Sequence, residues 1–339
     1  MTSISPLFRV FFILMCLSLG SSAVANNGTK MLNLTDDAVQ KEVVKVGIFL
    51  NDVQSIDLLV NNYMMDFYIW MRWKNPNIDP ASSFEFMNHS ESWATIITKS
   101  PEKPELLPNG EMYQLLHIQG RMSQKMDLRA FPFDRQNLTI LIEDSSLDAR
   151  GLVYMPEEVS MNPALKIPGF EFNKPSLKEA TYVYPTLFGY PKSKSTNEYS
   201  RLTFDLPIHR NTLTSFVKDI LPIWLTVLCS AFALMLNPRL IDSRFQIAIF
   251  SILSLIALQI SNGNDLPALQ YMNLMDALYV LGYLFLIALM TELIVTTRWV
   301  EDENPVNLMR AKKLDSNFGA ISLLSFLLMN ALLVFVVFD

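Results

Sequence analysis

The sequence is almost free of cysteine. Its 339 residues include two cysteines, Cys16 and Cys229, and each lies in an apolar run. The mixed-composition segment between these runs therefore has no cysteine. We expect it to fold in an oxidising compartment without disulfides.

Motifs of enzymes and metal sites are also missing. The three histidines, His89, His117 and His209, are scattered and show no metal-ligand spacing. No G-x-S-x-G, phosphate-cradling glycine loop or C-x-x-C occurs. A net charge of −6 argues against nucleic acid as a partner. We therefore expect no enzyme, no cofactor and no bound metal.

Apolar residues are abundant but unevenly distributed. Half of the residues are hydrophobic, 18% are charged, and the mean hydropathy is +0.24. Residues 1–210 are mixed and rich in Asp, Glu and Pro, whereas the remainder is dominated by long apolar runs. Two parts of different class follow from this asymmetry.

The N-terminus has the features of a secretory signal. Arg9 precedes an apolar run over 10–19, and a small-x-small end follows at 23–25. We predict a signal peptide over 1–25 and a linker over 26–40. The alternative is a short anchoring helix, but the run is too short to span a bilayer comfortably.

Four membrane spans are expected after residue 210. They cover 220–236, 242–264, 275–297 and 318–338. Each is near the roughly 20 residues that a bilayer requires. The links between spans one and two and between spans three and four carry Lys and Arg, while 261–273 carries none. The positive-inside rule predicts a multi-pass protein of the cell (inner) membrane with its N-terminal domain and C-terminus outside.

Residues 41–210 resemble a β-sandwich. Strand-like runs occur at 63–73, 113–120, 137–144 and 201–210, separated by turn-rich breaks. The last run alternates apolar and polar residues, as expected for a strand with one buried face. We predict an antiparallel, all-β, immunoglobulin-like sandwich over 41–210 and a membrane domain over 211–339.

Two groups in this segment stand out. "FPFDRQ" at 131–136 predicts a rigid turn with Asp134 at its tip, and a cis peptide before Pro132 is one form that such a turn takes. The second group is aromatic, and composition is equally consistent with a ligand cage and with core plus surface loop. Its members are Tyr68, Trp70, Tyr182, Tyr184, Phe188, Tyr190 and Tyr199.

The second span carries a polar stripe. On a helix of about 100° per residue, polar side chains near both ends share a face with an apolar centre. The stripe consists of Asp242, Gln246, Phe250, Leu253, Ala257, Ile260 and Asn264. One interpretation is a buried helix in a single-chain bundle. The other is a pore wall formed by several copies, with Leu253 as gate and a ring of Asp242 setting selectivity.

The ordered set of motifs resembles the pentameric ligand-gated ion channels, the Cys-loop receptors and their bacterial relatives. The matches are the FPFD turn, Trp73, Arg210, Pro222, Leu253 and "DLP" at 265–267. The resemblance covers roughly 40–339. It implies a homopentamer of this subunit and four identical partners, with ligands bound between sandwiches and a central pore lined by the second span.

The sequence departs from the animal members of this family. Gln124 and Leu138 stand where those members have the paired cysteines, and the link between spans three and four is short. Both departures resemble bacterial members. Ser100 replaces a frequent aromatic, and 143–149 lacks a frequent Trp. These differences disfavour a standard amine agonist.

The expected function is a ligand-gated, cation-selective channel opened by a small molecule or by protons. Asp242 would attract monovalent cations, while Arg244 would point away from the pore. Arg210 is expected to pair with Asp134, and Asp57 is a second candidate partner. The expected coupling residues are Asp57, Phe131, Pro132, Phe133, Asp134, Arg210 and Pro267. The alternative is a non-conducting sensor or solute-binding protein that the helices anchor in membrane lipid.

Overall fold

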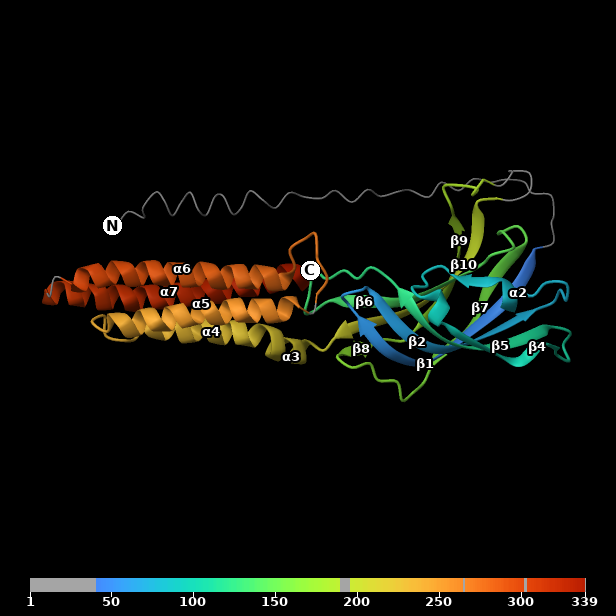
Figure 1. The fold of residues 1–339 in the computed structure, drawn as a ribbon, viewed down its shortest axis with the longest axis horizontal. Helices are drawn as coiled ribbons and strands as arrows, with labels where there is room; N and C mark the ends of the chain where they lie inside the picture. The colour runs from blue at the N-terminus through green and yellow to red at the C-terminus, as the bar shows by residue number, and fades with distance from the viewer. Residues whose placement is uncertain (1–40, 190–195, 265, 302–303, 339) are drawn as a thin grey trace. The chain divides into compact units, whose positions relative to one another are not determined.

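The computed structural model describes residues 41–189, 196–264, 266–301 and 304–338 (Figure 1). The predicted signal peptide and linker lie outside this range. Residues 40–339 form one compact unit, in which strands occupy the first part and helices the second. The predicted order of a β-sandwich followed by four apolar helices is confirmed.

The first sheet has five strands in the order β4-β5-β2-β1-β7. Their bounds are β4 Ile96–Leu106, β5 Met112–Ser123, β2 Asn62–Trp73, β1 Glu42–Asp57 and β7 Leu152–Met161. Strands β1 and β7 pair in parallel, so the expectation of a wholly antiparallel sandwich is wrong. The parallel pair is possible because a long connection returns the chain to the far edge of β1.

The second sheet has the order β3-β6-β10-β8, and β9 pairs with β10. Its strands are β3 Phe84–Phe86, β6 Arg135–Asp144, β10 Glu198–Arg210, β8 Phe170–Phe172 and β9 Ser176–Val183. Short helical turns, α2 Pro80–Ser83 and η1 Ser92–Ala94, lie between strands of the two sheets.

The core of the sandwich follows from alternation along the strands. On β10 every second side chain, from Leu202 to Ile208, is at most 2% exposed. Each such side chain stabilises the fold by about 1.5–3 kcal/mol through burial. Tyr63 of β2 adds a polar link between the sheets, since its hydroxyl donates to the Thr139 carbonyl at 2.6 Å and accepts from the Thr139 amide at 2.9 Å.

The four predicted strands are present, and six further strands were not predicted. Strand β4 illustrates why: its residues are mostly exposed, and it contains two prolines and two lysines. Such an edge strand has no buried face and therefore no hydrophobic period for a sequence argument to detect.

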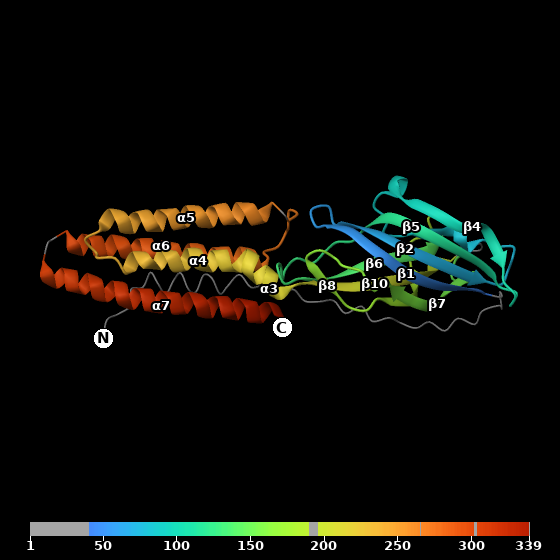
Figure 2. The same cartoon turned by 90° about the horizontal axis from the view of Figure 1, so that it is seen from below.

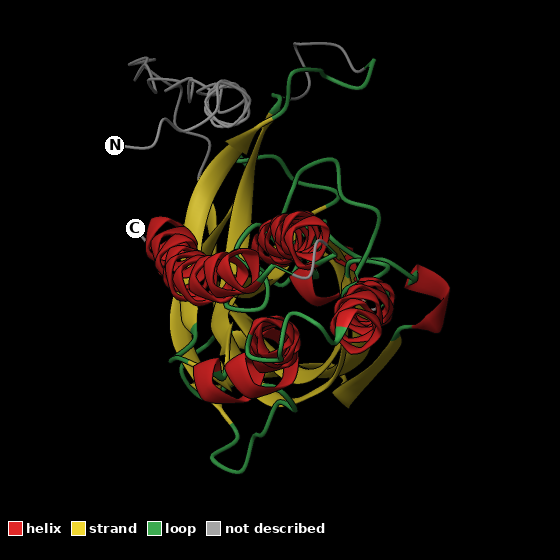
Figure 3. Cartoon of the chain, turned by 90° about the vertical axis from the view of Figure 1, so that its left-hand side faces the viewer, coloured by secondary structure: helices red, strands yellow, loops and turns green. Residues whose placement is uncertain are grey.

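The helices lie side by side (Figures 2 and 3). The first candidate span, Thr212–Leu234, combines α3 Thr212–Ser215, η2 Phe216–Ile220, α4 Leu221–Ala231 and η3 Phe232–Leu234. The others are α5 Ile241–Gly263, α6 Leu274–Val300 and α7 Pro305–Phe338. Helix η2 is a π-turn that ends two residues before Pro222, which lacks the N–H of a regular helical bond.

The first span and helix α7 begin earlier than expected. The first span starts at Thr212 rather than 220, and α7 starts at Pro305 rather than 318. The sequence-based bounds followed apolar runs alone. Helix α7 continues through a charged segment because such residues are good helix formers, and Pro305 suits a first helical turn.

Gly47 of β1 lies beneath the indole of Trp70 on β2. A Cβ built at position 47 would lie 2.1 Å from Trp70 Cζ2. We expect Gly47→Ala to displace the indole and destabilise the protein by about 1–3 kcal/mol, measured in a denaturant titration. Gly263→Ala is the control, since nothing lies within 4 Å of its Cβ position. Equal losses in both variants would contradict the packing argument.

Candidate functional site

Four of the predicted aromatic residues form one cluster, the aromatic lobe, made of Tyr182, Tyr184, Phe188 and Tyr199. The β9–β10 register places Tyr182 opposite Tyr199. Tyr184 contacts the other three rings, with centroid separations of 4.8, 5.3 and 5.7 Å. The hairpin thus carries an aromatic surface that is partly exposed. Tyr190, also predicted for this site, lies outside the described residues.

A side chain of the protein itself occupies the face of this lobe. The Arg201 guanidinium carbon lies 3.4 Å from the Tyr182 ring centroid. Arg201 Nε donates to Glu143 Oε1 at 2.5 Å, and Nη2 donates to the Tyr184 hydroxyl at 3.1 Å. The Tyr184 hydroxyl in turn donates to Glu143 Oε2 at 2.9 Å. The lobe therefore already holds a cation through cation–π contact and a charge-assisted pair.

Sequence reasoning missed Arg201 and Glu143 as site residues. The alternation of β10 placed Arg201 on the outward face, but nothing in the sequence joined it to Glu143 of β6. The signal that could have found it is the position of Arg201, two residues after Tyr199 on the same face of the strand.

Burial and charge shift two pKa values near the lobe. Burial raises the pKa of Tyr184, and its bond to Glu143 raises it further. The phenol therefore stays protonated and remains a donor at neutral pH. Burial, followed by the charges of Glu143 and Asp144, raises the pKa of Glu85 on the neighbouring β3. Glu85 therefore takes up a proton more readily than a free glutamate does.

Tyr68 and Trp70 lie apart from the aromatic lobe. Both belong to β2 in the other sheet, where Tyr68 stacks on His117 at 4.3 Å and Trp70 covers Gly47. His117 Nε2 also lies 2.8 Å from Asp66 Oδ1. Within one subunit the predicted ligand residues therefore form two groups, because β2 belongs to one sheet and β9 and β10 belong to the other.

The FPFD turn is anchored by a buried ion pair. Arg210 Nε donates to Asp134 Oδ1 at 2.8 Å, which confirms the predicted pairing. Gln136 Nε2 donates to Asp134 Oδ2 at 2.9 Å. The Arg210 guanidinium also lies over the rings of Phe131 and Phe170, at 4.9 and 4.7 Å. The Phe131–Pro132 peptide is cis, in line with expectation.

Two details of this prediction are wrong. Asp134 is 0% exposed and lies inside the turn rather than at its tip, because its carboxylate binds Arg210 and Gln136. Asp57 does not pair with Arg210. Its carboxylate instead accepts from the amides of Leu59 and Val60 and caps its own β1–β2 turn.

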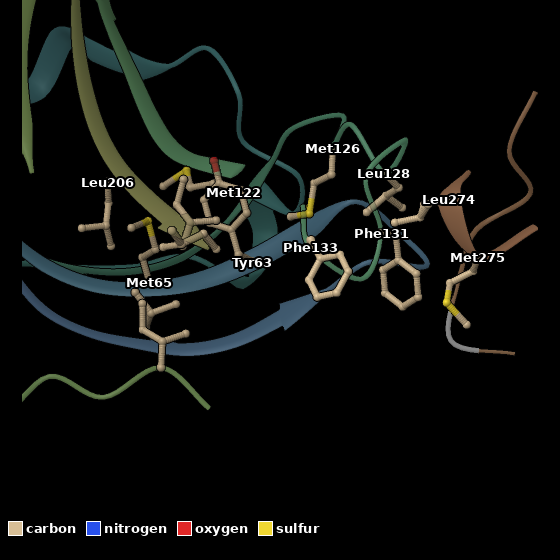
Figure 4. Packing of buried hydrophobic residues seen from close by; sticks show 14 of the residues in the cluster. Tyr63, Met65, Met122, Met126, Leu128, Phe131, Phe133, Leu206, Leu274 and Met275 are labelled. Carbon is tan, nitrogen blue, oxygen red and sulfur yellow. The ribbon is translucent and has the colours of Figure 1, made fainter. Parts of the chain in front are cut away.

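The chain around the FPFD turn contacts the helices directly. The Leu274 amide donates to the Arg129 carbonyl at 2.9 Å, and the Leu128 amide donates to the Tyr271 hydroxyl at 3.0 Å. Figure 4 shows Leu128 and Phe131 facing Leu274 and Met275 at the start of α6. Pro267 lies in the same α5–α6 connection and is half-buried.

Helix α5 has one buried and one uncovered face. Its buried residues are Arg244, Ala248, Ser251 and Leu255. The predicted stripe lies opposite and is exposed at Asp242, Gln246, Phe250, Leu253, Ala257, Ile260 and Asn264. Leu253 is 55% exposed and Phe250 66%. Arg244 points away from the stripe, as its wheel position predicted.

Comparison with known proteins gives distant relatives. The serotonin-gated chloride channel mod-1 of Caenorhabditis elegans is 25% identical over 303 residues, 80% of this chain and 58% of the relative. The acetylcholine-gated chloride channel subunit acc-2 of the same organism is 24% identical over 326 residues, 86% and 69%. A γ-aminobutyric acid receptor subunit beta of Lymnaea stagnalis is 25% identical over 217 residues, 60% and 40%.

No model of a known protein family matches the chain. The matched region spans 58% of the length of mod-1 and 40% of the Lymnaea stagnalis subunit. The relatives described above are named as channels or receptor subunits, and none of them is named as an enzyme.

The expectation of a cation-selective pore is wrong, because relatives of this chain are chloride channels. The sequence argument weighed the Asp242 carboxylate against Arg244 and left out the end of the helix on which Asp242 lies. Helix α5 begins at Ile241, and no side chain caps its first turn. The free N–H groups and the positive end of the helix dipole therefore lie beside Asp242 and oppose its charge. Arg239, exposed two residues before the helix, adds a further positive charge.

The buried pair Asp134–Arg210 should show strong energetic coupling. Truncating either partner to Ala should cost about 3–5 kcal/mol of the free energy of unfolding, because a buried charge is left unpaired. Removing both should cost less than the sum in a double-mutant cycle. The control is the Arg129–Asp127 pair, which is 3.8 Å apart and largely exposed, where about 0–1 kcal/mol is expected. Additive losses at Asp134 and Arg210 would count against the pair.

Proposed function

The chain is a member of the Cys-loop superfamily of pentameric ligand-gated ion channels, and on that premise we propose that it is itself a ligand-gated ion channel. It is a multi-pass membrane protein with four candidate spans. We place the protein in the cell (inner) membrane, with the sandwich, 41–210, and the C-terminus on the extracytoplasmic side. The membrane domain is assigned to 211–339. Its activity would be conduction, without enzymatic catalysis.

The uncovered stripe of α5 carries this proposal. Polar groups at membrane depth are costly unless they meet protein or water. The first span and α6 pack against the opposite face of α5 and leave Asp242, Gln246 and Asn264 exposed. Five copies arranged around an axis would turn this stripe towards a water-filled pore. A homopentamer thus accounts for polar residues that a single subunit leaves without cover.

Ligand binding would occur between neighbouring sandwiches. The aromatic lobe on β9–β10 and the pair Tyr68–Trp70 on β2 belong to different sheets of one subunit. In a ring, the lobe of one subunit would face β2 of the next, so that two half-sites complete one cage. Binding could shift the channel towards its open state only by the difference in affinity between the two states.

The chemistry of the lobe favours a small molecule with a carboxylate. Arg201 occupies the face of Tyr182 where a ligand ammonium would otherwise bind. A carboxylate could instead accept from the guanidinium edge, while Tyr184 and Glu143 keep Arg201 in place. The same arrangement explains physically why a simple amine is disfavoured.

The sandwich would transmit binding through the contacts of the FPFD turn. Asp134 and Arg210 hold this turn against the end of β10, and Arg210 directly precedes the first span. The neighbouring bonds to Leu274 and Tyr271 reach α6 and the α5–α6 connection. A movement of β10 would therefore act on α5 from two sides: through the first span, which precedes α5, and through the α5–α6 connection, which follows it. Phe131, Pro132, Phe133 and Pro267 belong to this interface.

Reconstitution under a chloride gradient in a voltage-clamped bilayer tests the channel and its gate together. From the relatives we propose that the permeant ion is chloride, so the current should reverse near the chloride potential. Leu253→Ser should hydrate the constriction and raise agonist sensitivity or leak by roughly tenfold, within the range of a 1–3 kcal/mol shift. Ile287→Ser, on an exposed part of α6, is the control. A wild-type current that reverses far from the chloride potential would refute anion conduction, and equal responses of the two variants would place the gate elsewhere.

Arg201 should decide which ligands act. Short amino acids with a terminal carboxylate should activate wild type, whereas amines of matched length should not. Arg201→Gln should weaken the response by roughly tenfold or more, since a charge-assisted hydrogen bond contributes about 1.5–3 kcal/mol. Arg150→Gln, which breaks the separate pair with Asp148, should leave the preference intact. Activation by the amines alone would overturn the assignment.

A further inference from the structure

Three charged side chains from three helices form a buried cluster at the inner end of the bundle. Arg244 of α5, Glu292 of α6 and Asp315 of α7 are 1%, 5% and 2% exposed. Arg244 Nη2 lies 2.6 Å from Asp315 Oδ1 and 3.8 Å from Glu292 Oε2. The cluster therefore contains one permanent cation and two carboxyl groups.

Each of the three side-chain nitrogens of Arg244 donates one hydrogen bond. Arg244 Nε donates to the Ala233 carbonyl at the end of the first span at 3.0 Å, and Nη1 to Thr296 Oγ1 at 3.3 Å. The Thr296 hydroxyl donates back to backbone, with the Glu292 carbonyl 3.1 Å away. The one donor that reaches a carboxylate oxygen of the cluster is Nη2, at Asp315 Oδ1.

Three buried carboxyl oxygens are left without a donor among the described residues. They are Glu292 Oε1, Glu292 Oε2 and Asp315 Oδ2. The two carboxyl groups lie within hydrogen-bonding reach of each other. An ionised carboxylate can only accept, so two such groups facing each other leave both unsatisfied. They would also leave a net negative charge in a buried site, at a cost of several kcal/mol.

One proton resolves both problems. Protonation of either carboxyl creates an O–H donor that bonds to the other and reduces the net charge of the cluster to zero. We propose that Glu292 and Asp315 form a proton-binding site that holds one proton between them, beside Arg244 on the inner side of the membrane domain. This site is distinct from the ligand site in the sandwich.

A groove of about 720 Å³ lies beside this site and, in the proposed topology, would give it a route to the inner aqueous phase. Asp315 lines it together with Lys312 and Ser316 of α7 and with Phe232, Met235 and Pro238 from the end of the first span. The titratable or charged groups that face the site are Arg244 from α5, Glu292 from α6 and Asp315 from α7, with Lys312 along the groove. From η3 the contact is the Ala233 carbonyl.

The position of Arg244 links the proton to the proposed pore. Arg244 lies in the first turns of α5, on the face opposite the stripe. Loss of the proton would leave a second buried negative charge on α6 or α7, which the single charge of Arg244 cannot neutralise as well. Relief requires water in the groove or a shift of these helices against α5. An alkaline inner phase would therefore alter the arrangement of the helix that lines the pore.

Infrared difference spectroscopy on the purified full-length protein in lipid tests the site without any current. A pH titration of wild type should show the C=O stretch of a protonated carboxyl, shifted in deuterated water. The band should be lost in Glu292→Gln, whose amide replaces the O–H donor, or in Asp315→Asn. Glu301→Gln, at the exposed end of α6, should retain it. Absence of the band in wild type, or its survival in both cluster variants, would overturn the proposal.

The link to the pore has its own test. Inner-side pH should change the current of wild type and Glu301→Gln, and this response should be lost in Glu292→Gln. An identical pH response in wild type and Glu292→Gln would overturn the link. Because the infrared band is independent of conduction, a silent channel and an absent proton site would be told apart.

Discussion

Every charged or amide side chain within a membrane span must contact a partner or water, because hydrocarbon offers no hydrogen bonds. Helix α5 meets this constraint in two ways. Its inward face places Arg244 among Asp315, Thr296 and the Ala233 carbonyl, so that all four spans meet at one guanidinium. Its other face leaves an amide at either end uncovered. The bonds of Arg244 fix which face of α5 is turned towards the other helices. The uncovered amides on the opposite face require contact with water or with further subunits.

The same reasoning applies where the sandwich joins the helices. Asp134 is buried completely and is compensated by Arg210 and Gln136, while Phe131 covers the guanidinium. An ion pair whose carboxylate is buried and bonded at both oxygens is weak as a source of stability but strict in its geometry. Together with the Leu274–Arg129 bond it gives β10 and α6 a defined relation within the subunit. A defined joint of this kind is what transmission of movement between two layers requires.

A candidate site could be predicted from the sequence where its residues lie close together in the chain or belong to motifs, and could not where they meet only through the pairing of distant strands. The stripe of α5 follows from helical period alone, and the pairing of Asp134 with Arg210 follows from two motifs with charged residues. The aromatic lobe was found as a group of residues, but its occupant was not. Arg201 and Glu143 come together only through the pairing of β6 with β10. Ion selectivity was predicted wrongly because a single carboxylate was counted without the helix end on which it sits.

By itself the sequence determined the class of the protein: a cysteine-free β-sandwich followed by four spans, with one span polar along a single face. These properties depend on composition and on periods of two and 3.6 residues, which neighbours in sequence express. The tertiary structure decided which charges meet. Asp134 is buried, and Asp57 accepts a hydrogen bond within its own β1–β2 turn. The aromatic residues lie on two different sheets, and Arg244, Glu292 and Asp315 come together from three helices. Electrostatic partners act through space over a few ångströms, and residues as far apart in the chain as 244 and 315 become neighbours only when the chain is packed.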